Sequence, residues 1–279
     1  AREENITVKT DCEVSAVTPR KVATASGEEL ACDAVVIATG FALFDARVKE
    51  EYGYGIYDNV ITSADLERMF NDGAVKLKSG GAPRRIAILH CVGSRDEKVC
   101  QRHCSKVCCV TGVKQAIELK KLFPSADVFN FYMDIRMFGP GYEEMYREAQ
   151  EKHNIHFVRG RISEVSPTID ERLQIKAEDT LTGRPLKIGV DMLVLLIGMK
   201  ADAMNASLEE RSGLRRQPSG FMQPRDSFLG NVESGAAGIF YAGAVTAPKS
   251  VGESLNEGTA AARAALEWLG ATHKTDSQR

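Results

Sequence analysis

The sequence contains no Gly-x-Gly-x-x-Gly turn anywhere along its 279 residues. In nucleotide-binding domains this turn follows a buried strand and presents a helix N-terminus to a pyrophosphate. The sequence also contains no Cys-x-x-Cys pair, the spacing from which zinc knuckles and many dithiol redox centres are built. These two absences argue against a complete dinucleotide-binding domain and against the simplest zinc or dithiol chemistry.

Long apolar runs and charge of one sign are lacking as well. The longest apolar stretch, Met192 to Ile197, is far shorter than the roughly 20 residues of a membrane span, and no positively charged leader with an apolar core opens the sequence. The 36 basic and 38 acidic residues are interspersed and give a net charge of -2. We therefore expect no nucleic-acid partner and no direct membrane insertion, and we predict a cytoplasmic chain or the cytoplasmic part of a complex.

Cysteine, by contrast, is concentrated in one place. Five of the seven cysteines fall between Cys91 and Cys109, directly after an apolar run, Ile86 to His90, that is typical of a buried strand. An odd total and the adjacent pair Cys108 and Cys109 fit a disulfide scaffold poorly. The pattern favours a reduced compartment and a metal or redox role at the end of this strand.

Strands and helices are predicted to alternate, which indicates a parallel sheet covered on both faces and hence an α/β fold. Early strands are expected at Asn5 to Lys9 and Glu13 to Val17, with a hairpin around Gly27. Later strands are expected at residues 85–90, 127–132, 155–159, 162–165 and 173–177, with helices at about 103–123 and 142–152.

Three segments have the pattern of two-domain flavoproteins. Residues 32–41 form an acidic residue, a buried β run and an Ala-Thr-Gly ending, in which Thr39 and Gly40 bring the backbone close to a cofactor. Residues 191–198 repeat this pattern without the threonine. Residues 238–245, with Gly243 and Ala244, and the helix-like stretch from Glu253 resemble the end of a flavin domain.

This order, as in the two-domain disulfide reductases, predicts two Rossmann-like domains. Residues 1–80 and 200–279 would form a discontinuous, partial FAD-binding domain, and residues 84–199 an inserted NAD(P)-binding-like domain that carries the cysteines. Because no glycine-rich turn opens the flavin part, we expect the chain to be a fragment that lacks the front of that domain.

The cysteine segment suits an iron–sulfur cluster. Four-iron clusters take soft thiolate ligands, commonly several from one compact segment. On a helix from about His103, Cys104 and Cys108 would share one face, with Cys109 about 100° round, and Cys91 would approach from the strand end. A structural zinc site and redox-active thiols remain alternatives at this point.

A resemblance adds to this pattern. Residues 91–96, 103–110, 114–117, 132–144 and 157–161 together resemble the A subunit of heterodisulfide reductase and its relatives, including the flavoprotein subunits of quinone-interacting oxidoreductase complexes. The resemblance extends from about Ala34 to Ala262 and implies a thioredoxin-reductase-like fold that binds FAD and a [4Fe-4S] cluster. Carried over by position, the cluster ligands are Cys91, Cys104, Cys108 and Cys109, and Cys100 is left over.

The resemblance also implies roles near the flavin. Lys114 matches a lysine that lies close to the flavin, where a cation would favour the reduced ring; an ordinary exposed helix lysine is the alternative. Thr39, Gly40, Gly243, Ala244, Lys249 and Glu253 are the expected FAD contacts, with a plain loop as the alternative for Lys249 to Glu253. Ala244 stands where flavoproteins often have aspartate, so one hydrogen bond to the cofactor is expected to be missing.

The leading hypothesis is an oxidoreductase subunit that passes electrons between FAD and a [4Fe-4S] cluster to partner iron–sulfur subunits, with a homodimer left open. One alternative is a pyridine nucleotide-disulfide oxidoreductase that uses a cysteine pair, although no Cys-x-x-Cys pair is present. The other is a zinc-stapled docking module.

Overall fold

The computed structural model describes residues 4–276, with side chains up to residue 271. The chain divides into two compact units, one formed by the residues up to Ala42 together with those from Lys200 onward, the other by Leu43–Met199. Two short paired strands, β5 (Ala42–Leu43) and β14 (Met199–Lys200), connect them. Residues 43–80 were assigned to the flavin part by sequence, but they lie in the second unit because β6 (Val60–Thr62) pairs with that unit's central sheet.

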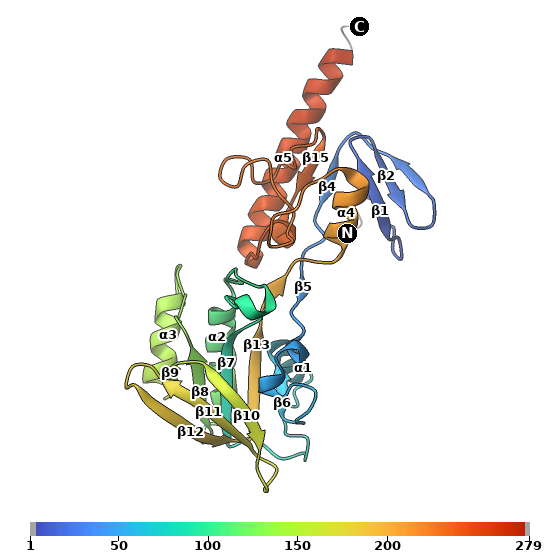
Figure 1. Cartoon of the computed structure of the whole chain (residues 1–279). Helices are drawn as coiled ribbons and strands as arrows, with labels where there is room; N and C mark the ends of the chain where they lie inside the picture. The colour runs from blue at the N-terminus through green and yellow to red at the C-terminus, as the bar shows by residue number, and fades with distance from the viewer. Residues whose placement is uncertain (1–3, 277–279) are drawn as a thin grey trace. The chain divides into compact units, whose positions relative to one another are not determined.

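The second unit is built on a five-stranded sheet whose strands are all parallel (Figure 1). The strand order is β6-β13-β7-β8-β9. The bounds of the strands after β6 are β7 (Arg85–Val92), β8 (Asp127–Tyr132), β9 (His156–Arg159) and β13 (Met192–Ile197). Carboxyl ends of parallel strands meet at one edge, so the loops after β7, β8 and β13 gather on the same side of this unit.

The two faces of this sheet have different covers. On one face lie the helices α1 (Ser63–Asn71), α2 (Cys108–Leu122) and α3 (Tyr142–Glu151), and on the other an antiparallel sheet of β10 (Ile162–Pro167), β11 (Leu173–Asp179) and β12 (Arg184–Val190). Because side chains alternate along a strand, Ile86 and Ile88 pack with the helices while Ala87 and Leu89 pack with the antiparallel sheet. Full burial on both faces explains the unbroken apolar runs of β7 and β13.

Local signals fix where α1 begins. Thr62 accepts a hydrogen bond at its Oγ1 from the backbone N–H of Asp65 at 3.2 Å, and the Asp65 carboxylate accepts one from the Thr62 N–H at 2.9 Å. This reciprocal capping box satisfies N–H groups that the first helical turn would otherwise leave without partners. The helix therefore follows directly from β6.

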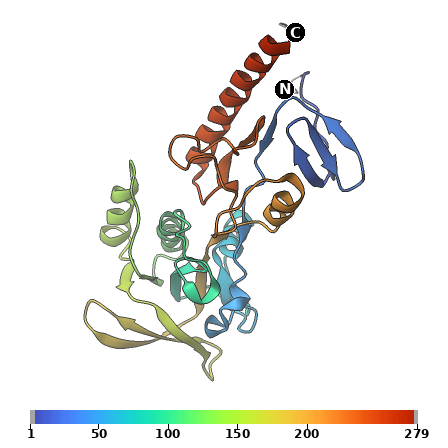
Figure 2. The same ribbon diagram turned by 45° about the horizontal axis from the view of Figure 1, so that its top comes forward.

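The first unit combines a small antiparallel sheet with a parallel pair. Strands β1 (Val14–Thr18), β2 (Lys21–Thr24) and β3 (Glu29–Ala31) form the antiparallel sheet, and β4 (Val35–Ile37) pairs in parallel with β15 (Ile239–Tyr241). The helices are α4 (Met204–Ser212) and the long α5 (Val251–Asp276), which lies beside β15 in both views (Figures 1 and 2). Val17, Leu208, Tyr241 and their neighbours form the core of this unit.

The α/β fold class with a parallel sheet is confirmed, as are the strands predicted at 127–132 and 162–165. The strand predicted at Asn5 to Lys9 is wrong, because residues 6–10 have no regular structure and no neighbouring strand to pair with. Ile6 and Val8 are 66% and 78% exposed, so their β-forming side chains have no surface to pack on. Between residues 4 and 276, the structure has no helix with the length and apolar character that crossing a membrane requires.

Asp191, just before β13, ties the amino-terminal ends of two strands together. Its Oδ2 accepts hydrogen bonds from the backbone N–H groups of Arg84 and Arg85, each at 2.8 Å, and its Oδ1 accepts one from Nε of Arg172 at 2.8 Å. Burial raises the pKa of Asp191, but these hydrogen bonds together lower it by more, so the pKa lies below its usual value. A carboxylate with a lowered folded-state pKa stabilises the fold above its unfolded pKa of about 3.9, and this stabilisation is lost as the pH falls through the folded value.

Replacing Asp191 by asparagine should lower the free energy of unfolding at pH 7 by about 1–3 kcal/mol, because three hydrogen-bond donors lose a charged acceptor. The same variant should lose less stability than the native chain between pH 6 and about 3. Urea unfolding across this pH range measures both effects. Asp127→Asn is a suitable control, since Asp127 is half-exposed and lies 3.4 Å from Arg85; an acid dependence of Asp191→Asn equal to that of the native chain would contradict the assignment.

Candidate redox site at the cysteine loop

The cysteine segment lies at the carboxyl edge of the parallel sheet, between the end of β7 and the start of α2. Four non-glycine residues in it have left-handed backbone conformations, with φ of 62° at Cys91, 54° at Arg95, 56° at Cys100 and 62° at Lys106. Such conformations cost about 1–3 kcal/mol each and persist only where the surrounding structure enforces them. The loop therefore holds its side chains in a defined arrangement at an energetic cost.

Helix α2 begins at Cys108, so the prediction of a helix from about His103 is wrong by more than one turn. Cys104 lies in the irregular loop before the helix, where the backbone N–H of Lys106 donates to its Sγ at 3.4 Å. The left-handed backbone of Lys106 prevents a helix from continuing through this stretch. The thiols of Cys104 and Cys108 thus come from two different elements and do not share one helix face.

All the cysteines between residues 91 and 109 are free thiols, and they differ in exposure. Cys91, Cys108 and Cys109 are buried, Cys104 is half-buried and Cys100 is exposed. The buried thiols are 6%, 8% and 4% exposed. Three of the four cysteines predicted as cluster ligands are therefore shielded from bulk solvent and Cys104 is partly shielded, whereas Cys100 is exposed.

Electrostatics shows that Cys91, Cys104, Cys108 and Cys109 lie near one another. Burial raises the pKa of Cys108 to about 12, and the thiols of Cys91, Cys109 and Cys104 raise it further. Burial also raises the pKa of Cys91 to about 11, with added contributions from Cys109 and Cys104. The pKa of Cys109 is raised by burial and by Cys104 as well. Every pair within this set interacts, and we call these four residues the thiol set.

The loop after β8 closes one side of the thiol set. The carbonyl oxygen of Asp134 accepts a contact from Sγ of Cys109 at 3.7 Å, and the Asp134 carboxylate accepts a hydrogen bond from Nη2 of Arg95 at 2.7 Å. Arg136 and Arg159 lie 3.9 Å and 3.8 Å from the same carboxylate. Asp134 therefore acts as an internal ion-pair centre, with Arg95 and not Arg136 as its nearest partner.

The loop after β13 closes another side. Ser94 and Ser105 share a hydrogen bond of 2.5 Å, and Oγ of Ser105 accepts the backbone N–H of Met199 at 2.8 Å. A Cβ on Gly198 would clash with Oγ of Ser94 and would lie 2.6 Å from the carbonyl oxygen of Gly93. Glycine is required here because the ends of β7 and β13 approach too closely for any side chain.

A buried histidine supports the loop from below. Nε2 of His90 and Oδ1 of Asn130 lie 2.9 Å apart, and both residues are buried. Burial lowers the pKa of His90 to about 4, so the ring is neutral near pH 7. The amide oxygen of Asn130 then accepts from Nε2–H, which agrees with a packing role for His90 and leaves the sulfur chemistry to the thiol set.

No three Cys, His, Asp or Glu side chains among the described residues converge closely enough to hold a single metal ion. A zinc ion needs four ligands about 2.3 Å from one point. In a four-iron cluster each thiolate binds a different iron atom, so the ligands surround a volume. The thiol set contains no disulfide, and its four thiols could supply one ligand each to such a cluster.

The expected flavin contacts fall in the first unit, at the carboxyl edge of its parallel pair. Ile37 lies opposite Tyr241 in the register of β4 and β15, so the segments that carry Thr39, Gly40 and Gly243, Ala244 emerge side by side. Gly40 and Gly243 have φ of 74° and 71°, and a Cβ on Gly40 would meet open space. Two glycine turns at one sheet edge can bring backbone groups close to a cofactor.

Glu257, which the sequence did not single out, organises this edge. It is 8% exposed, and its carboxylate accepts from the backbone N–H of Gly243 at 3.0 Å and from Asn231 at 2.9 Å. Nζ of Lys249 lies 3.2 Å from the same carboxylate and donates to the carbonyl oxygen of Gly243 at 3.0 Å. Lys249 therefore holds the turn in place, and the Glu257 carboxylate of α5 already accepts the hydrogen bond that the Gly243 N–H can donate.

Glu253 and Lys114 have local partners. The Glu253 carboxylate accepts the N–H of Ser250 at 2.8 Å while Oγ of Ser250 accepts the N–H of Glu253 at 3.3 Å, which is a capping box at the start of α5. Lys114, on α2 in the second unit, is half-exposed and forms an ion pair of 3.2 Å with Glu67 of α1. Their proposed roles at the flavin remain predictions.

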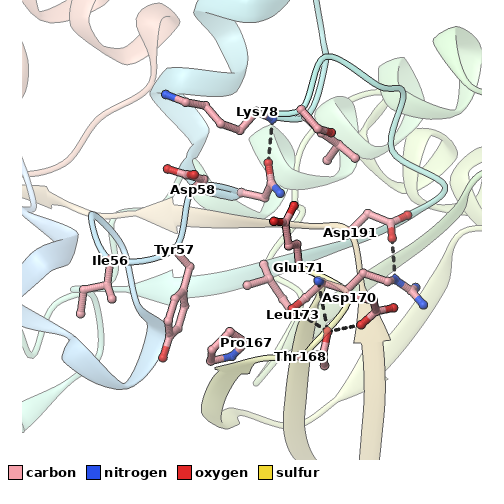
Figure 3. A pocket seen from close by; sticks show the side chains of 14 residues that line it. Ile56, Tyr57, Asp58, Lys78, Pro167, Thr168, Asp170, Glu171, Leu173 and Asp191 are labelled. Atoms are coloured by element: carbon pink, nitrogen blue, oxygen red, sulfur yellow. Dashed lines mark hydrogen bonds and ion pairs between the residues drawn. The ribbon is translucent and has the colours of Figure 1, made fainter.

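A pocket of about 520 Å³ lies at the other end of the second unit's sheet, next to the starts of β6 and β13 (Figure 3). Tyr57, Pro167 and Leu173 form part of its wall. Its polar groups are largely engaged with one another, as in the hydrogen bonds of Thr168 with Asp170 at 2.5 Å and of Arg172 with Asp191 at 2.8 Å. Open α/β sheets bind ligands at the carboxyl ends of their strands. Because this pocket lies at the opposite end, we assign it no functional role.

Comparison with curated proteins identifies relatives of this chain, although no protein-family model matches it. It is 39% identical over 245 residues to the A subunit of the H(2):CoB-CoM heterodisulfide,ferredoxin reductase of Methanothermobacter thermautotrophicus, which covers 85% of the chain and 37% of the relative. It is 39% identical over 237 residues to the iron-sulfur A subunit of the CoB-CoM heterodisulfide reductase of Methanocaldococcus jannaschii, covering 82% of the chain and 36% of the relative. The chain thus spans little more than a third of these relatives.

Solved structures confirm the fold. Thioredoxin reductase of T. acidophilum aligns with a TM-score of 0.61 and 18% identity over 94% of this chain and 74% of its own. Thioredoxin reductase of Lactococcus lactis aligns with a TM-score of 0.60 and 17% identity over 93% and 75%. The predicted thioredoxin-reductase-like α/β fold is therefore confirmed.

Proposed function

Since this chain is homologous, over most of its own length, to the A subunit of heterodisulfide reductase, we propose that it is part of an electron-transferring oxidoreductase subunit that uses FAD and a [4Fe-4S] cluster. The observation that supports the proposal is the thiol set, in which three buried cysteines and the half-buried Cys104 interact with one another at the carboxyl edge of a parallel sheet. The M. jannaschii relative has iron-sulfur in its name.

The thiol set fits a cluster in charge and in shape. Cys91 approaches from the end of β7, Cys104 from the loop, and Cys108 and Cys109 from the first turn of α2. A helix N-terminus carries a partial positive charge, which favours the thiolate form that a metal requires. Burial raises the pKa of Cys91, Cys108 and Cys109, so metal binding would have to release protons as the ligands form.

The first unit would hold FAD at the turns after β4 and β15. Thr39 and Gly40 on one side and Gly243 and Ala244 on the other present adjacent backbone turns, and Lys249 with Glu257 fixes the second turn. FAD accepts two electrons and releases them one at a time, whereas a cluster moves single electrons. The residues of the first unit would bind and orient FAD, and those of the second unit would hold the cluster that transfers single electrons.

Partners follow from the names of the relatives, which are subunits of heterodisulfide reductases. We propose that this chain delivers electrons to further iron–sulfur subunits of a comparable complex. A cytoplasmic location fits this role. A homodimer would be an additional level of assembly.

The metal content of the full chain, purified and reconstituted without oxygen, tests the proposal. About four iron and four sulfide per chain, with a broad absorption near 400 nm, are the expected result for a [4Fe-4S] cluster. One zinc ion per chain without iron would contradict the proposal and favour the alternative of a zinc-stapled docking module. If the chain binds no metal and two of its thiols exchange with an added dithiol, the result would favour a disulfide oxidoreductase that uses a cysteine pair.

A further inference from the structure

Arg95 carries a hydrogen-bond donor that the described protein does not satisfy. Its Nη2 donates to Oδ2 of Asp134 at 2.7 Å and its backbone N–H donates to the carbonyl oxygen of His103 at 2.9 Å. Its Nη1, however, is buried and has no hydrogen-bond partner among the described residues. A buried charged donor without a partner destabilises the fold, so an acceptor is expected at this position.

The guanidinium group is held against the thiol set. Asp134, to which Nη2 is bound, contacts Sγ of Cys109 through its carbonyl oxygen at 3.7 Å. Burial lowers the pKa of Arg95, but the hydrogen bond to Asp134 and then the thiols of Cys91 and Cys104 raise it to a net value above the usual one. The guanidinium group is therefore close enough to the thiol set to interact with Cys91 and Cys104 electrostatically, and its Nη1 has no partner among the described residues.

The left-handed backbone of Arg95 explains how the side chain reaches this position. With φ of 54° the residue turns the chain back beside His103 while its side chain is 22% exposed. The planar guanidinium can donate from Nη2 to a carboxylate and from Nη1 to a second acceptor at once, which the ammonium of lysine cannot do in the same fixed geometry. The clamp on Asp134 fixes the direction of the second donor.

We propose that Arg95 is a positioning residue for the cluster, with Nη1 donating to cluster or cysteine sulfur and the guanidinium charge favouring the reduced form. The inference rests on the proposed function. A [4Fe-4S] centre gains one negative charge on reduction, and hydrogen bonds to its sulfur atoms are among the factors that set its potential. With Arg95 beside it, the centre is easier to reduce than the same four-thiolate centre would be without this arginine.

The test uses the full chain, reconstituted with iron and sulfide, in native form and as Arg95→Lys, Arg95→Gln and the control Arg102→Gln. Arg102 is 80% exposed, lies in the same segment and pairs with Glu97 at 3.5 Å. Its replacement therefore removes one positive charge, as in Arg95→Gln, but at an exposed position outside the thiol set. Iron content is measured for each variant, and the midpoint potential by titration followed with electron paramagnetic resonance. We expect native iron content, a potential shifted downward in Arg95→Gln, a smaller downward shift in Arg95→Lys, and no shift in Arg102→Gln.

A second measurement needs no variant. In native protein labelled with 15N at arginine, electron–nuclear double resonance of the reduced centre should show one 15N coupling and exchangeable protons that disappear in deuterated water. Absence of the 15N coupling, or full iron content with an unshifted potential in both Arg95 variants, would overturn the role of Arg95 and leave the proposed function standing. A native chain that binds no iron would overturn both.

Discussion

A chain in which Cys108 is replaced by serine is expected to lose its iron, from about four atoms per chain to below about one, together with the absorption near 400 nm. Cys108 is 8% exposed in the first turn of α2, and it interacts with all three other members of the thiol set. Serine keeps the size of the side chain, but its hydroxyl is a poor ligand for iron because it stays protonated near neutral pH. Iron and sulfide assays after reconstitution measure the loss.

Cys100→Ser is the matched control for this experiment. Cys100 lies in the same loop with a left-handed backbone, but its thiol is exposed and outside the thiol set. The control should retain about four iron atoms. Full iron content in Cys108→Ser, or equal loss in Cys100→Ser, would show that the ligands are not the four residues proposed here.

The framework that carries the site could be predicted because its signals are local and strong. The strand at Met192–Ile197 is an apolar run of strand length that is buried on both faces, and the strand at Asp127–Tyr132 is rich in the β-forming residues Val, Phe and Tyr. Alternation of strands with helices then indicates a parallel sheet, and the cysteines follow at its carboxyl edge. The position of the site could thus be inferred before its geometry.

The internal shape of the cysteine loop could not be predicted. Its left-handed residues include Arg95 and Lys106, which are not residues that favour φ above zero. Hydrogen bonds that join Ser94, Ser105 and Met199 help to enforce such conformations. Ser105 and Met199 lie 94 positions apart, so local spacing alone cannot reveal this contact and predicts a helix from His103 instead.

The partners of single residues were also hidden from the sequence. Glu257 lies on a helix face 14 residues after Gly243 and has the pattern of an ordinary charged position, yet it binds the N–H of that glycine. Arg95 and Asp134 meet only because β7 and β8 are neighbouring parallel strands. Tertiary contacts of this kind follow from strand order, which local propensity does not encode.

The buried ion pair of Lys49 with Asp96 accounts for the second large effect that we expect. The two residues are 5% and 4% exposed, and Nζ of Lys49 lies 2.8 Å from Oδ2 of Asp96 and 2.7 Å from Glu51. Oδ1 of Asp96 accepts the N–H of Lys98 at 3.0 Å, and its backbone pairs with Gln101. The pair therefore anchors the start of the cysteine loop to the segment before β6.

Lys49→Met should lower the free energy of unfolding by about 3 kcal/mol, because it leaves the Asp96 carboxylate buried with only Arg161, at 3.8 Å, as a nearby cation among the described residues. Urea unfolding of the metal-free chain measures this. Adding Asp96→Asn should restore part of the loss, since asparagine keeps an oxygen for Lys98 and removes the uncompensated charge. Lys98→Met, at an exposed position, should change stability by less than about 0.5 kcal/mol.

Because the pair anchors the loop, its loss should also weaken iron retention, and the two effects can be separated. If Lys49→Met/Asp96→Asn recovers stability without recovering iron, the anchor acts on loop geometry and not on overall folding. If Lys49→Met unfolds like the native chain within about 1 kcal/mol, the pair contributes no more than an exposed one, and the left-handed loop must be held by its other contacts, such as those of Ser94 and Ser105.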